Sequence, residues 1–125
     1  MEVTPGPNES PVEDVLERVS DAFFALDDQW RFTYVNSRAG EILERSPDEL
    51  IGANLWETFP EAVGTEFEEA YRRAMATQES VTFRARYEPL QAWFEVRTYP
   101  SKTGLSVYFH DITEERRRSE ERRVG

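Results

Sequence analysis

The second half of the sequence contains three consecutive segments in which apolar and polar residues alternate. These segments are residues 80–88, 93–99 and 104–112. A period of two predicts strands that bury one face, and the short connections between the segments favour antiparallel pairing. Residues 22–27 and 31–35 predict a further hairpin, with an Asp-Asp-Gln-Trp turn between them. The chain must therefore fold around an antiparallel sheet, and that sheet needs a cover for its apolar face.

Helical patterns lie between these two groups of strands. Asn36 is suited to cap a short helix that continues through Leu43, and a Ser-Pro-Asp-Glu capping box at 46–49 begins a helical turn. Residues 52–64 look like a loop. A capping box beginning at Thr65 opens a longer helix. One face of that helix carries Phe67, Ala70, Tyr71, Ala74 and Met75. Strands at both ends with helices between them predict an α+β fold, an antiparallel sheet with helices packed on one face.

The two ends of the chain differ from the central domain, which we expect over residues 20–112. Residues 1–10 offer little that can pack and predict a flexible tail. Residues 11–19 predict an N-terminal cap helix. Its apolar stripe consists of Val12, Val15, Leu16 and Val19. Residues 113–125 are rich in Glu and Arg at helical spacing, which predicts a solvated helix that leaves the domain.

Composition narrows the classes of protein further. The chain of 125 residues has no cysteine, which excludes disulfides and Cys-ligated metals. Its net charge of −10 opposes binding to nucleic acid or anionic lipid. No apolar run could span a bilayer and the N-terminus is not a secretory signal, so we expect a cytoplasmic location. The basic residues include a single lysine, Lys102. An acidic, lysine-poor surface favours a halophilic source over an ordinary acidic protein from a GC-rich genome.

Several short motifs, taken in order, resemble the PAS superfamily over about residues 12–113. They are Leu26-Asp27, Tyr34-Val35-Asn36, the Ser-Pro-Asp-Glu-Leu-Ile-Gly segment at 46–52, Gly52-Ala53-Asn54, Trp93-Phe94-Glu95-Val96 with Pro100, and Asp111-Ile112-Thr113. The specificity lies in their order and spacing rather than in any single motif. The resemblance implies a curved five-stranded antiparallel sheet with a pocket between its concave face and the helices.

Strand alternation sorts the side chains that would line this pocket. The candidate lining residues are Phe24, Leu26, Leu43, Leu50, Leu55, Phe67, Tyr71, Met75, Phe83, Ala85, Phe94, Val96, Val107 and Phe109. Such a pocket would take a small apolar ligand. The alternative is that the same residues fill a dry core, as apolar stripes at helical spacing usually do.

The resemblance also indicates which cofactors to expect. Flavin-binding light sensors of the superfamily carry a reactive Cys directly after the G-x-N motif, where this chain has Leu55, so no cysteinyl flavin adduct is expected. Non-covalent flavin remains open, although Phe94, Val96 and Phe109 offer the flavin ring no hydrogen bonds. Haem-binding members use a His of the longer helix, which has none here. His110, the single His, is predicted to be a surface residue or a pH-sensing group beside Asp111. No metal site is predicted.

The sequence predicts a sensory or regulatory domain of a larger signalling protein, without catalytic residues of its own. By resemblance, Asp111 and Thr113 would relay a signal through the exit helix to an effector in the same chain, a histidine kinase or a DNA-binding regulator. A homodimer is expected. One alternative is a ligand-free dimerisation module of a transcription regulator, with outer-face Trp93, Tyr108 and Ile112 and the cap helix as its seam. A remote alternative is a small cone-shaped α+β enzyme.

Overall fold

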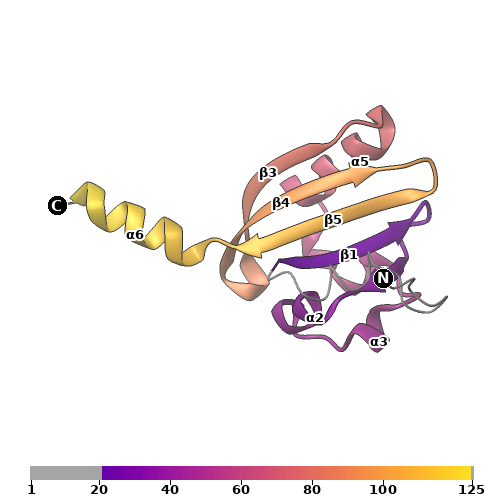
Figure 1. The fold of residues 1–125 in the computed structure, drawn as a ribbon, viewed down its shortest axis with the longest axis horizontal. Helices are drawn as coiled ribbons and strands as arrows, with labels where there is room; N and C mark the ends of the chain where they lie inside the picture. The colour runs from indigo at the N-terminus through magenta and orange to yellow at the C-terminus, as the bar shows by residue number, and fades with distance from the viewer. Residues whose placement is uncertain (1–20, 125) are drawn as a thin grey trace, which may run out of the picture.

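The structure is a computed structural model that describes residues 21–124, with side chains up to residue 120. Its strands are β1 Ala22–Asp27, β2 Phe32–Val35, β3 Val81–Tyr87, β4 Ala92–Pro100 and β5 Gly104–Asp111. They form one antiparallel sheet in the order β2-β1-β5-β4-β3, which confirms the predicted fold class (Figure 1). The predicted tail over 1–10 and cap helix over 11–19 lie outside the described residues.

The helices between β2 and β3 cover one face of this sheet (Figure 1). They are α2 Ser37–Leu43, α3 Pro47–Leu50, α4 Leu55–Thr58, the 3-10 turn η1 Pro60–Ala62 and α5 Glu66–Thr77. A second 3-10 turn, η2 Glu88–Leu90, joins β3 to β4, and α6 Thr113–Val124 follows β5. The sheet and its helical cover enclose a single core of buried apolar side chains.

The first hairpin turns around the carboxylate of Asp27. Its Oδ1 accepts hydrogen bonds from the backbone N–H groups of Gln29, at 2.8 Å, and Arg31, at 2.9 Å. Its Oδ2 pairs with Arg31 Nε at 3.0 Å. These hydrogen bonds, first among them the one from the Arg31 backbone, lower the pKa of Asp27. Trp30 completes the turn at a φ of 65°, in the left-handed region.

Local capping explains where the short helices begin. The Ser46 hydroxyl and the Glu49 side chain form the predicted reciprocal capping box of α3. The capping box predicted to begin at Thr65, at the start of α5, is only partly formed. The Thr65 hydroxyl caps Phe67 N–H, but Glu68 accepts from Gly64 N–H at 2.8 Å instead of from Thr65. Gly64, at a φ of +84°, turns the chain so that its own N–H faces Glu68.

The predicted loop over residues 52–64 is wrong in its middle, because the chain there forms α4 and η1. The Asn54 side chain caps α4 by accepting from Trp56 N–H at 2.9 Å and Glu57 N–H at 3.0 Å. Pro60 occupies the first turn of η1, where its missing N–H is no loss. These turns are too short to show a helical period in the sequence, so the cap is their main local signal.

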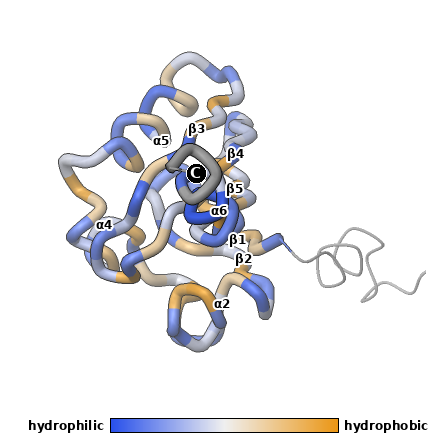
Figure 2. Tube along the Cα trace, turned by 90° about the vertical axis from the view of Figure 1, so that its left-hand side faces the viewer, coloured by the Kyte–Doolittle hydropathy of each residue, from blue (hydrophilic) through white to orange (hydrophobic). Residues whose placement is uncertain are grey.

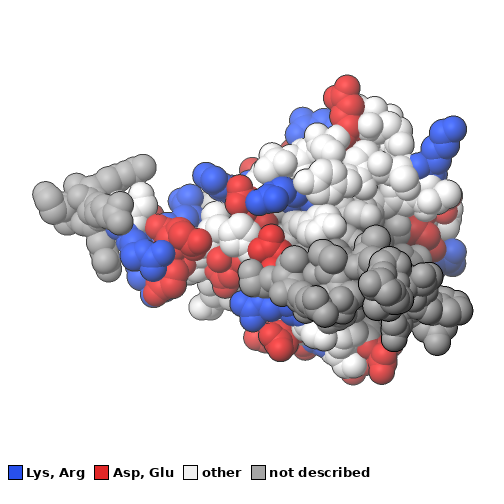
Figure 3. All heavy atoms as spheres, viewed as in Figure 1, with Lys and Arg blue, Asp and Glu red and all other residues white. Residues whose placement is uncertain are grey.

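The exit helix α6 has a different character from the rest of the fold. It extends away from the sheet beyond β5, and it is hydrophilic along its course (Figures 1 and 2). Acidic and basic side chains alternate over its surface in Figure 3, and Glu114 and Arg117 lie 3.6 Å apart. Such a helix gains little from burial, so its position depends on the contacts of its first turn.

Candidate functional site

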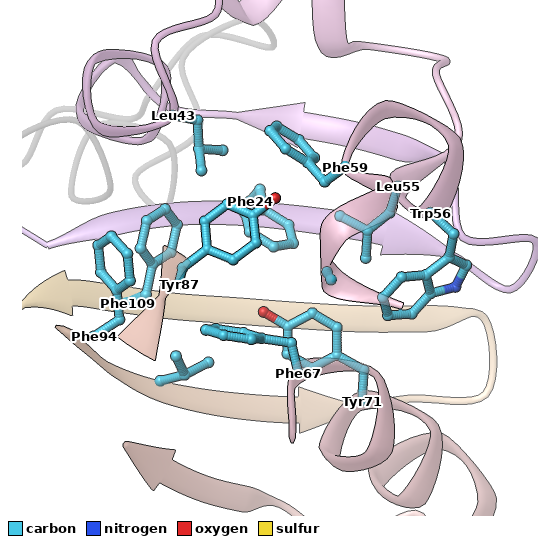
Figure 4. A pocket seen from close by; sticks show the side chains of 12 residues that line it. Phe24, Leu43, Leu55, Trp56, Phe59, Phe67, Tyr71, Tyr87, Phe94 and Phe109 are labelled. Carbon is cyan, nitrogen blue, oxygen red and sulfur yellow. The ribbon is translucent and has the colours of Figure 1, made fainter. Parts of the chain in front are cut away.

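A cavity of about 60 Å³ lies between the inner face of the sheet and the helical cover (Figure 4). It is lined by Phe24, Leu43, Leu55, Trp56, Phe59, Ala62, Phe67, Tyr71, Tyr87, Phe94, Val96 and Phe109. None of these residues carries a formal charge at neutral pH. The space exceeds the roughly 10–15 Å³ that one water needs, but it is less than half of the about 150 Å³ of an engineered cavity that binds benzene.

The floor of the cavity consists of side chains on the inner face of three adjacent strands. Phe24 of β1 and Phe94 of β4 each meet Phe109 of β5 edge to face, with ring centroids 5.7 Å apart. Val96 lies opposite Phe109 in the register of β4 and β5. Because alternate residues of a strand share a face, the neighbours of these residues point away from the cavity.

The opposite wall comes from the helical cover. Phe67 and Tyr71 project from α5, while Leu55 and Trp56 project from α4. The guanidinium of Arg72 lies 5.2 Å from the Trp30 ring centroid and 5.3 Å from that of Trp56. Glu68 Oε2 holds this guanidinium at 2.8 Å. The stack therefore links α4, α5 and the first hairpin on the outside of the cavity wall.

Two tyrosine hydroxyls point into the cavity from opposite sides, Tyr87 from the end of β3 and Tyr71 from α5 (Figure 4). Burial raises the pKa of Tyr71 well above its usual range. Burial, together with the Glu61 carboxylate, raises the pKa of Tyr87 to about 12. The Tyr87 hydroxyl is out of contact with solvent. The Glu61 carboxylate lies close enough to act on it, but no group of the described residues meets it in hydrogen-bonding geometry. Both tyrosines are therefore neutral groups at physiological pH.

The junction between the sheet and α6 is held by a chain of hydrogen bonds centred on Trp93. Its carbonyl accepts from Ile112 N–H at 2.8 Å, and its N–H donates to Thr113 Oγ1 at 2.9 Å. Asp111 Oδ1 accepts from Thr113 N–H at 2.8 Å, which satisfies one of the free donors at the start of the helix. The Arg116 guanidinium lies 3.7 Å from the centroid of the Trp93 ring.

The sequence over residues 16–117 matches the family described as PAS fold. The chain belongs to this PAS family. No curated protein matches the sequence. Among solved structures, the PAS domain of a protein from Colwellia psychrerythraea is 18% identical with a TM-score of 0.67, and the match covers 82% of this chain and 95% of that one.

Two further structures place the same fold in different proteins. A sensory box sensor histidine kinase from Vibrio cholerae is 17% identical with a TM-score of 0.65, over 82% of this chain and 90% of that one. The VqmA–ligand–DNA complex from Vibrio cholera is 20% identical with a TM-score of 0.67, over 85% of this chain and 53% of that one. At such identities the likeness shows the fold alone.

The structure of this PAS domain separates the candidate pocket residues into two groups. Those that line the cavity are Phe24, Leu43, Leu55, Phe67, Tyr71, Phe94, Val96 and Phe109. The remainder lie in the surrounding core, where Leu26, Leu50, Ala85 and Val107 are buried and Met75 and Phe83 are partly buried. These residues belong to the apolar core or pack against it, but they do not line the cavity.

Sequence reasoning missed part of the cavity wall. The residues it did not name are Trp56, Phe59, Ala62 and Tyr87. Three of them fall in the stretch that was expected to be a loop. Tyr87 is the last residue of β3, and its parity with Phe83 and Ala85 on the same strand was the available signal.

His110 lies on the outer face of the sheet of this PAS domain, away from the cavity. Its side chain is about one-third exposed, at 32%. Its ring nitrogens lie 3.8 Å from Asp21 Oδ1 and 3.8 Å from Glu95 Oε1, so its acidic neighbours are these two rather than Asp111. Within the described part of the chain, no three His, Asp or Glu side chains converge as metal ligands. Every helix of that part is too short or too polar to cross a membrane.

Proposed function

We propose that this PAS domain is a non-catalytic sensor that couples the occupancy of its cavity to the position of α6. The observation that carries the proposal is that neighbouring residues of β4 contact both the cavity and the first turn of α6. Phe94 faces the cavity, and the preceding residue, Trp93, holds the first turn of α6. Since neighbouring residues of a strand point to opposite faces, a shift of β4 moves both contacts together.

The coupling has a simple physical form. A small apolar molecule, or a partner that compresses the helical cover, changes the packing of Phe94 and Phe109 on the sheet floor. A packed core responds by adopting a second arrangement rather than by continuous deformation. The anchors at Trp93 and Thr113 carry this change into α6. Such a switch needs two states separated by only a few kcal/mol.

The output lies beyond this domain. We infer an effector in the same full-length chain, a histidine kinase or a DNA-binding regulator, connected through α6. The solved relatives named above include one of each kind. The polar surface of α6 suits a helix that leads toward such an effector. We also expect the domain to form a homodimer.

A substitution that fills the cavity tests the coupling without knowledge of the ligand. Ala62→Leu adds apolar volume from η1 into the cavity, and we expect it to shift the backbone amide resonances of Trp93 and Thr113. Adding Thr113→Val removes the hydroxyl that accepts from Trp93 while keeping the side-chain shape. The resonances of α6 should then become insensitive to Ala62→Leu. Thr82→Val, at an exposed position of β3, is the matched control.

The full-length protein provides the functional readout. Asp111→Ala should leave the domain folded and reduce the effect of Ala62→Leu on effector output by at least about fivefold, a typical coupling free energy. If Ala62→Leu leaves every α6 resonance unchanged in the otherwise wild-type chain, the cavity and the helix are not coupled. The domain would then be better described as a dimerisation module with a dry core.

A further inference from the structure

The Tyr87 hydroxyl is the feature of the cavity that packing alone does not explain. Tyr87 is only 8% exposed, and its hydroxyl has no hydrogen-bond partner among the residues that the structure describes. A buried hydroxyl without a partner is costly, whereas phenylalanine would fill the same place without that cost. In Figure 4 this hydroxyl points inward among the aromatic rings that line the cavity. A group that enters the cavity would find there a donor that nothing else satisfies.

The surroundings of the hydroxyl define the kind of molecule that it would bind. The lining is uncharged and almost wholly apolar. Two charged groups outside it act on Tyr87 in opposite directions, the Glu61 carboxylate raising its pKa and the Arg45 guanidinium lowering it. An anion would lose its hydration and meet no cation in the lining itself. A cation would find no charged partner within the lining. A neutral molecule with one hydrogen-bond acceptor and an apolar body meets neither penalty.

Size provides a second restriction. The cavity volume of about 60 Å³ is below that of cavities that bind benzene. It is also far below the several hundred Å³ of sites for drug-sized ligands. The occupant must therefore be a molecule smaller than benzene unless the aromatic rings repack around it.

We propose that the cavity binds a small, neutral carbonyl compound, such as a short-chain ketone or aldehyde, whose oxygen accepts a hydrogen bond from the Tyr87 hydroxyl. This inference rests on the proposed function, because it names the chemical class of the signal. The phenol donates the hydrogen bond, and the alkyl part of the ligand lies against Phe24, Phe94 and Phe109.

Three probes of similar size test the proposal by titration followed through backbone amide resonances. Butanone is the neutral acceptor, xenon is an apolar probe without an acceptor, and propionate is the anion. Tyr87→Phe removes the proposed donor, and it should fold because phenylalanine fills the same place and no described residue loses a well-formed hydrogen bond. Tyr108→Phe removes a tyrosine hydroxyl on the outer face of the sheet, outside the cavity lining, and is the matched control.

We expect butanone to shift the resonances of cavity residues in the wild-type and Tyr108→Phe proteins. Tyr87→Phe should weaken butanone binding about tenfold, the loss of one buried hydrogen bond. Xenon should bind all three proteins alike, and propionate should bind none of them. Equal butanone affinity in wild-type and Tyr87→Phe proteins would overturn the role of Tyr87, and propionate binding as tight as that of butanone would overturn the neutral class.

The same titration distinguishes this inference from the proposed function. Butanone that binds through Tyr87 without moving the resonances of Trp93 and Thr113 would support the ligand class and refute the coupling to α6. Absence of both xenon and butanone binding would show a closed core and would refute the ligand class together with sensing through this cavity.

Discussion

The guanidinium of Arg116 lies over the indole of Trp93, with its central carbon 3.7 Å from the ring centroid. This contact joins the first turns of α6 to β4. It adds to the hydrogen bond between Trp93 N–H and Thr113 Oγ1, so that one residue of the sheet holds two side chains of the helix. A helix with almost no apolar surface is thereby fixed at its start and left free of the core along the rest of its length.

Because of this contact, loss of the Arg116 guanidinium should loosen the start of α6. Arg116→Gln should speed amide hydrogen exchange in the first two turns of α6 by about twofold to thirtyfold, since cation–π contacts contribute about 0.5–2 kcal/mol. Arg117→Gln is the matched control, because Arg117 is exposed and pairs with Glu114 on the same helix at 3.6 Å. Similar exchange rates in the two variants would mean that the stacking does not hold the helix.

Replacement of the buried polar residue Asn36 by alanine should cause a large loss of stability. Its side chain is 1% exposed and its Oδ1 accepts from Phe23 N–H at 3.1 Å and Ala39 N–H at 2.9 Å. It thus caps α2 and ties that helix to β1. Asn36→Ala leaves two buried donors without this acceptor and should cost about 2–4 kcal/mol of unfolding free energy.

Urea denaturation measures this cost. Asn54→Ala is the comparison, because Asn54 caps α4 by the same kind of bond at a more exposed position, and its loss should cost about 1 kcal/mol. A smaller effect at Asn36 than at Asn54 would contradict the assignment of Asn36 as a buried link between α2 and β1.

The hydrogen bonds of Asp27 in the first hairpin should make the free energy of unfolding depend on pH in the acid range. The hydrogen bonds to Asp27, led by that from the Arg31 backbone, lower its pKa in the folded state. A lowered folded-state pKa stabilises the protein above the unfolded-state pKa of about 3.9, and this contribution is lost as pH falls through the folded-state pKa. Asp27→Asn keeps the shape and removes the charge.

Urea midpoints measured from pH 6 down to about pH 3 check this expectation. The wild-type protein should lose more stability over that range than Asp27→Asn does. Parallel curves for the two proteins would show that Asp27 contributes nothing to acid sensitivity. Asp28→Asn, one residue further along the turn, is the control for a general change in net charge.

Any side chain at position 104, the first residue of β5, should clash with the backbone of β1. A Cβ atom at this position would lie 1.9 Å from the carbonyl oxygen of Leu26, which is backbone and cannot move aside. Gly104→Ala should therefore cost about 3 kcal/mol or more, or separate β5 from β1. Gly64→Ala meets no atom within 4 Å and should cost only the strain of its positive φ, about 1 kcal/mol.

Thermal unfolding of both glycine variants checks this difference. The melting temperature should fall several degrees further in Gly104→Ala than in Gly64→Ala. Equal melting temperatures would mean that β1 and β5 can separate at this point without loss of the sheet, contrary to their continuous pairing from Ala22 to Asp27.

The confirmed expectations about strands and helix caps rest on patterns among residues close together in the chain. The alternation around Phe94 and Phe109 placed both on the inner face, because the side chains of a strand change face at every residue. The capping box at Ser46 was identified because both of its hydrogen bonds join residues three apart or fewer. The Thr65 box was only partly right, since the turn at Gly64 redirected one of its hydrogen bonds.

The sequence by itself determined the strands, the longer helices, their caps and the face of each that is buried, because these depend on periods and contacts within a few residues. Only the tertiary structure decided that β1 lies between β2 and β5, that Tyr87 and Phe59 reach the cavity, and that Trp93 meets Thr113. These relationships join residues far apart in the chain. They arise when the sheet and its helical cover pack together, and no local pattern encodes the space that remains between them.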